Sequence, residues 1–295
     1  MKHMDFQDFC NEVSARISEF LLDFEIHEIR VVDIPKNNGI ELKALVIVSS
    51  KDTVYPAIYL QPYYQYYCRN GDMEQVLQEL ATQFRERYRT MDIRNPTMEE
   101  LRMLQRQVFF CLVNYEKNEK MLQECPHLPF YDMAIVFRYL VHQDDTGIAS
   151  AILKNEDMKR IGLDHQSLYN LAYANTRLFL KPQLVLLSKL LRDRYEYEVP
   201  DIPEIYVLSS HNYMYGAGMI LYPELLEQVA REYDGDFFII PSSIHEVLIC
   251  TMQGEEARQR LQEILQEVNE FVVEEGDYLS DQLYRYDKKI GKILI

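Results

Sequence analysis

Residues 235–249 read GDFFIIPSSIHEVLI, and this stretch decides the fold class. Phe237–Pro241 and Glu246–Met252 are short apolar runs on either side of a turn-rich centre, a pattern typical of two paired strands. Residues Glu255–Val273 then repeat apolar side chains at helical spacing, which predicts a helix that covers the strand pair. Its buried stripe is expected to contain Ala257, Leu261, Ile264, Leu265, Val268 and Val272.

The same order of strand, strand and helix recurs along the chain. It is expected in residues 1–90, where Asn38-Gly39 marks a hairpin turn, again in 133–176, and twice within 205–273. Each strand pair needs a helix to cover its apolar face. The sequence therefore predicts an α+β fold of repeated β-β-α units, with mixed, largely antiparallel sheets and helices packed mainly on one face.

The remaining segments fit this scheme. Thr97–Glu100 is a capping box, Pro182–Arg192 is expected as a helix, and Ala217–Leu221 is expected as a strand. The polar segment Tyr195–Pro203, with two prolines, is the expected domain boundary. We therefore expect an N-terminal region of residues 1–194 and a C-terminal region of 195–295, or one continuous domain.

Charge and cysteine content limit the function classes. Lys and Arg number 31 against 47 Asp and Glu, giving a net charge of −16, which repels nucleic-acid phosphates and anionic lipid. The five cysteines are widely spaced and never form C-x-x-C, as in reduced cytoplasmic proteins. With no apolar run long enough for a membrane span, a cytoplasmic protein is expected, with no membrane partner and nucleic acid unlikely as a partner.

Several strings carry a resemblance to a known family. They are DMAIVFR (132–138), GIASAIL (147–153), GAGMILYP (216–223), GDFFIIPSSIHEVLI (235–249) and LSDQLYRYD (279–287). Together they resemble an uncharacterised bacterial family, a domain of unknown function frequent in gut Firmicutes, in which P-S-S-x-H-E-V is the distinctive motif. The resemblance implies no activity.

The segment 241–247 holds the candidate catalytic residues Ser243, His245 and Glu246. A hydroxyl, an imidazole and a carboxylate can supply a nucleophile, a base and an orienting group. Neighbouring side chains on a strand point to opposite faces, so Ser243 and His245 could share a face that Glu246 would not join. The alternative is structural, with the serines satisfying turn amides.

Arg138 is a candidate binding residue because its strand positions surround it with apolar side chains. A guanidinium cannot shed its charge there and needs a partner. Glu246 is flanked in the same way on its own strand. We hypothesise that Arg138 and Glu246 form a buried ion pair, or that both face one polar pocket.

A tyrosine cluster forms the second candidate binding site. Tyr63, Tyr64, Tyr66 and Tyr67 crowd a segment expected to run from a strand into a loop. Exposed tyrosines suit protein recognition, because they bury a large area with little loss of rotamer entropy. The alternative is that they cover a helix.

Three functions remain open. The favoured one is a non-enzymatic cytoplasmic module that binds a partner, expected to be another protein, through aromatic and acidic surface. The second is a small-molecule hydrolase that uses the 241–247 segment, and the third is an acidic mimic of nucleic acid. No cofactor or metal is expected, because Gly216-Ala217-Gly218 is not G-x-G-x-x-G and Cys125-Pro126-His127 lacks a second ligand pair.

Overall fold

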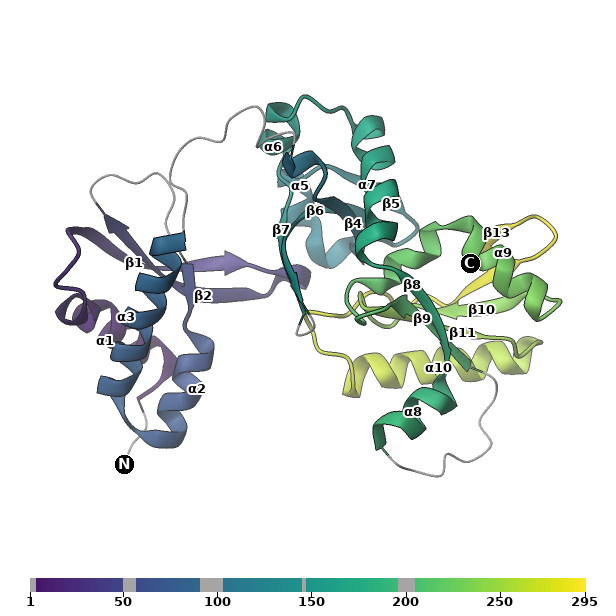
Figure 1. Cartoon of the computed structure of the whole chain (residues 1–295). Coiled ribbons are helices and arrows are strands. Elements are labelled where there is room, and N and C mark those ends of the chain that lie inside the picture. The colour runs from purple at the N-terminus through teal and green to yellow at the C-terminus, as the bar shows by residue number, and fades with distance from the viewer. Residues whose placement is uncertain (1–3, 50–56, 91–102, 145–146, 196–204) are drawn as a thin grey trace. The chain divides into compact units, whose positions relative to one another are not determined.

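The computed structural model describes residues 4–49, 57–90, 103–144, 147–195 and 205–295 (Figure 1). The chain divides into two compact units. Unit 1 comprises Met1–Lys36 and Ile40–Pro96, and unit 2 comprises Asn37–Gly39 and Thr97–Ile295. The boundary expected at 194/195 instead falls inside unit 2, where the strands on either side of it pair with each other. The polar segment that suggested it lies, from residue 196 onward, outside the described residues.

Unit 1 is a three-stranded antiparallel sheet covered by helices. Its elements are α1 (Phe6–Arg16), η1 (Ile17–Phe20), β1 (Ile26–Pro35), β2 (Glu41–Ser49), β3 (Ala57–Tyr59), α2 (Gln61–Asn70) and α3 (Met73–Thr90). The predicted β1–β2 hairpin is confirmed. Asn38 and Gly39, in η2 (Asn37–Gly39), adopt the positive φ angles of 59° and 73° that the tight turn needs.

Unit 2 contains a six-stranded sheet in the order β13-β12-β10-β11-β9-β8. Its strands are β8 (Pro182–Leu186), β9 (Ile205–Ser210), β10 (Phe237–Ile240), β11 (Glu246–Cys250), β12 (Tyr284–Asp287) and β13 (Lys292–Leu294). Helices α8 (Leu187–Tyr195), α9 (Pro223–Glu232) and α10 (Glu255–Phe271) accompany it, together with the 3-10 helix η4 (Gly216–Leu221).

A second sheet of unit 2 is built on the long strand β6. Its strands are β4 (Val108–Asn114), β5 (His127–Phe130), β6 (Met133–Asp144) and β7 (Gly147–Ile152). The helices η3 (Glu116–Asn118), α5 (Glu119–Glu124), α6 (Asn155–Arg160) and α7 (His165–Phe179) lie around it. The predicted β6–β7 hairpin is confirmed, and so is the α+β class with antiparallel strand pairs.

Strand alternation sorts the core of unit 2 into two faces. Phe237 and Ile239 join the large cluster that contains η4 and α9, whereas Phe238 and Ile240 pack beneath Leu261 of α10. Figure 1 shows α10 running along β10 and β11. Helices thus cover both faces of this sheet, whereas the sequence analysis expected them mainly on one.

Two segments differ from their expected structure. Pro182–Leu186 was expected to begin a helix but forms β8, because its backbone completes the ladder of β9. Ala217–Leu221 was expected as a strand but coils into η4, all of whose residues are buried. The amides of Gly216 and Ala217 bond to the carbonyls of His245 and Ile244, so they cannot join a ladder. The capping box at 97–100 lies outside the described residues.

Candidate functional site

His245 is the central side chain of the turn between β10 and β11. Its Nδ1 atom accepts a hydrogen bond from the backbone N–H of Tyr215 at 3.2 Å. The ring proton therefore sits on Nε2, which faces Asp277 Oδ1 at 3.2 Å. Both ring nitrogens therefore have partners within the protein, and the side chain is only 19% exposed.

Ser243 belongs to the same turn but is not bonded to the imidazole. Its Oγ accepts the backbone N–H of His245 at 3.0 Å, and its backbone bridges to Tyr278. Glu246 lies on β11, opposite Ser209 of β9. A serine nucleophile needs a hydrogen bond to a free base, and this turn gives Ser243 a capping role instead.

The backbone of the neighbouring loop is held in an unusual conformation. Tyr213 and Tyr215 have φ angles of 55° and 53°, in the left-handed region that residues other than glycine rarely adopt. The His245 carbonyl fixes the end of this loop, because it accepts from Ser209 Oγ at 2.7 Å and from Gly216 N–H at 2.9 Å.

Arg138 reaches the same region from β6. Its Nε donates to Ser150 Oγ at 2.9 Å and one terminal nitrogen donates to the Ser150 carbonyl at 3.2 Å. The guanidinium lies over the Tyr215 ring, 5.3 Å from its centre. These hydrogen bonds of Arg138 go to the adjacent strand β7, and its pairing with Glu246 stays a prediction. Tyr215, which touches both Arg138 and His245, was missed by the sequence reasoning.

The tyrosine cluster is helical rather than looped. Leu60 precedes α2, Pro62 occupies its first turn, and the helix ends at Gly71 in the left-handed region. Tyr63, Tyr64 and Tyr67 pack on the core of unit 1, and the Tyr64 hydroxyl donates to the Met4 carbonyl. Tyr66 alone of the four is exposed, at 38%, and it donates to Gln75. Three of the four tyrosines therefore pack against unit 1, and a role of this cluster in recognition stays a prediction.

An exposed apolar surface is present on α10. Ala257, Leu261 and Leu265 are buried as expected, but Ile264 is 38% exposed and Val272, at the helix end, is 74% exposed. Phe271, seven residues after Ile264 and thus on the same side of the helix, is 77% exposed. We call Ile264, Phe271 and Val272 the α10 apolar patch.

The α10 apolar patch lies in an acidic segment of the sequence. Residues 261–284 contain seven acidic side chains and neither Lys nor Arg: Glu263, Glu267, Glu270, Glu274, Glu275, Asp277 and Asp281. Glu267 and Glu270 are exposed and lie four residues and one residue before Phe271. Exposed apolar side chains in a segment whose charges are mostly of one sign favour a partner of the opposite charge.

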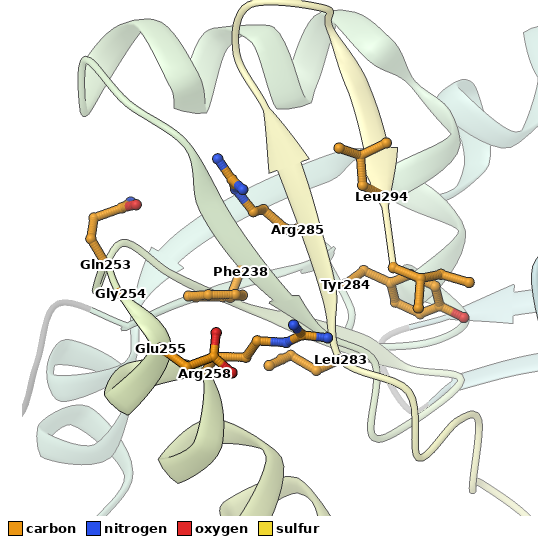
Figure 2. A pocket seen from close by; sticks show the side chains of 10 residues that line it. Phe238, Gln253, Gly254, Glu255, Arg258, Leu283, Tyr284, Arg285 and Leu294 are labelled. Atoms are coloured by element: carbon orange, nitrogen blue, oxygen red, sulfur yellow. The ribbon is translucent and has the colours of Figure 1, made fainter.

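A recess of about 310 Å³ lies at the beginning of α10 (Figure 2). Figure 2 shows Arg258 beside Leu283, Arg285 on the other side of the Phe238 ring, and the Tyr284 hydroxyl turned away. Gly254, the N-cap, offers no side chain to the first amides of α10. However, Arg285 forms an ion pair with Asp236, and Glu255 lies next to Arg258, so opposing charges already line the recess.

Asp236 leads to a pH-dependence prediction. Its bonds to Arg285 and to the Lys288 amide hold its pKa below the usual value. A lowered folded-state pKa stabilises the protein at pH values above the unfolded-state pKa of about 3.9, and the contribution disappears as the pH falls through the folded-state value. We expect Asp236→Asn to lower the urea midpoint of unit 2 at pH 7. The difference from wild type should shrink toward pH 2, and an unchanged difference would contradict this origin.

The described ranges contain no helix long and apolar enough to cross a bilayer. In the same part of the chain, no three His, Cys, Asp or Glu side chains gather as metal ligands would.

Comparison with known proteins gives one match. No curated protein and no solved structure matches the chain significantly. The model of a family of unknown function, DUF5688, matches residues 6–288, which is nearly the whole length. The chain therefore belongs to the DUF5688 family of unknown function.

Proposed function

We propose that this chain is a cytoplasmic protein-binding module, and that the α10 apolar patch is its contact surface for a positively charged protein segment. The observation that carries the proposal is the 77% exposure of Phe271 within a 24-residue stretch that holds seven carboxylates and no cation. The five free cysteines support a reducing compartment.

The chemistry of the patch defines its partner. Phe271, Val272 and Ile264 offer apolar area at the end of a helix whose other face is firmly packed, so little ordering is needed on binding. The surrounding carboxylates favour Lys and Arg and repel acidic proteins. A segment that alternates apolar and basic residues, such as a basic amphipathic helix, satisfies both features.

The alternatives have less support. A hydrolase based on the 241–247 turn needs a serine on a free imidazole nitrogen, but the Ser243 hydroxyl and both His245 nitrogens have other partners. A mimic of nucleic acid would use carboxylates alone and gives no role to an exposed phenylalanine.

Site-specific photo-cross-linking tests the proposal. Phe271 is replaced by p-benzoylphenylalanine in the full chain, which is then irradiated in lysate of its native cells, and the adducts are sequenced. We expect adducts with a segment rich in Lys, Arg and apolar residues, and we expect high salt to suppress them. The same photoreactive residue at Leu178, which is 68% exposed on α7, is the control.

A charge series completes the test. The triple variant Glu263→Gln, Glu267→Gln, Glu270→Gln should lose most of the adduct. Glu116→Gln, Glu119→Gln, Glu232→Gln removes the same charge elsewhere on the surface of unit 2 and should keep it. Equal adducts at positions 271 and 178, or equal losses in the two triple variants, would refute the assignment.

A further inference from the structure

A hollow of about 420 Å³ opens in unit 2, away from α10. It lies between strand β5 with its turn, η4 with the start of α9, and the β12–β13 hairpin. Its lining is almost entirely apolar or aromatic: Leu128, Pro129, Phe130, Tyr131, Ile135, Tyr169, Ile220, Leu221, Pro223, Leu226, Tyr286, Gly291, Lys292 and Ile293. A volume of this size falls in the lower range of small-molecule sites.

The lining is recessed, which argues against a flat protein partner. Four of the lining residues are buried: Ile135, Ile220, Leu226 and Tyr286. Among the large apolar side chains of the lining, Tyr131 is the strongly exposed one. A protein surface would meet the rim, whereas a small molecule can reach the walls. The rim is also held in place, because the Tyr131 hydroxyl donates to the Ile293 carbonyl at 2.5 Å and joins the β5 turn to β13.

The polar groups of the hollow are donors. Lys292 is its only charged lining residue, and within the described residues its ammonium forms no ion pair. Burial raises the pKa of the Tyr131, Tyr169 and Tyr286 hydroxyls, so these groups remain neutral at neutral pH, and the Tyr131 proton is already donated to the Ile293 carbonyl. The walls are thus apolar, and the charged residue among the lining is the exposed Lys292, in a chain whose net charge is −16.

We infer that this hollow binds a small apolar carboxylate, such as a medium-chain fatty acid, with its hydrocarbon against Leu128, Ile135 and Leu226 and its carboxylate at Lys292. Burial of the chain supplies the affinity and the ammonium selects the charge of the head group. The inference is independent of the α10 apolar patch, which lies on other elements of unit 2.

Calorimetric titration of the full chain with dodecanoate, below its micellar concentration, tests this site. We expect one dodecanoate bound per chain, and dodecyltrimethylammonium, with the same tail and the opposite charge, should bind about tenfold more weakly. Lys292→Met should weaken dodecanoate binding by about tenfold. Lys289→Met, on the same hairpin but outside the lining, should leave it unchanged.

A cavity-filling variant tests the position of the tail. Leu128→Trp places a large ring in the hollow and should weaken dodecanoate binding whether or not Lys292 is present. If Leu128→Trp does not fold, the comparison of Lys292→Met with Lys289→Met still decides the question, because both positions are exposed. Absence of binding, equal affinity for the two head groups, or equal affinity of the two Lys variants would each overturn the inference.

Discussion

Replacing Gly216 with alanine should abolish stable folding of unit 2. A Cβ atom at this position would lie 2.4 Å from Ser209 Oγ and from the Ser210 nitrogen, and 2.5 Å from the His245 carbonyl oxygen. Two of these three atoms are backbone atoms, at the end of β9 and directly before β11, so the clash cannot be relieved by a rotamer change. Displacing that backbone breaks several hydrogen bonds at once, and we expect a loss above about 4 kcal/mol.

Urea denaturation of the full chain, followed by circular dichroism, measures the effect. Gly235→Ala is the matched control, because its Cβ would meet the Tyr233 carbonyl at an ordinary 3.8 Å and its φ lies outside the left-handed region. That change should stay within about 1 kcal/mol. A Gly216→Ala protein as stable as Gly235→Ala would show that the loop is not locked at the His245 carbonyl.

Phe110→Ala should destabilise unit 2 by about 3–5 kcal/mol, the range for removing a fully buried aromatic ring. The ring has no exposed surface and packs among Tyr169, Tyr173 and Tyr222, with centroid distances of 5.8–6.4 Å. It also lies against Gly218 of η4, so its removal leaves a cavity where β4 meets the buried 3-10 helix.

The free energy of unfolding from urea titration measures this prediction as well. Leu178→Ala removes an apolar side chain that is 68% exposed on α7 and should change stability by less than about 0.5 kcal/mol. Phe110→Leu restores part of the volume and should recover a substantial part of the loss. If Phe110→Ala lowers the free energy of unfolding no more than Leu178→Ala does, the packing of Phe110 among these tyrosines does not stabilise unit 2.

Local signals identified most of the regular elements. The Asn38-Gly39 turn depends on chemistry within two residues, and the structure contains it. Segments whose structure depends on distant partners could not be predicted. The segment that holds Tyr63 to Tyr67 was expected to run from a strand into a loop, but it forms α2, with Pro62 in the first turn, where proline is tolerated.

The candidate site shows the same limit. The sequence brought Ser243 and His245 to attention, but Asp277 follows α10 and Tyr215 precedes η4, so neither neighbour of His245 could be found from spacing. The α10 apolar patch was hidden for a related reason. Helical periodicity places Ile264 and Val272 with the buried stripe, yet it does not reveal where the sheet beneath the helix ends.

The six-stranded sheet has two outer strands, β13 and β8, and each is poorly suited to recruiting a strand from another molecule. β13 is three residues long, and the carbonyl of its central residue Ile293 is occupied by the Tyr131 hydroxyl. β8 begins with Pro182, which has no amide hydrogen to offer. A short edge strand and a missing amide donor protect against edge-to-edge aggregation, so we expect the six-stranded sheet to resist growth into a fibril.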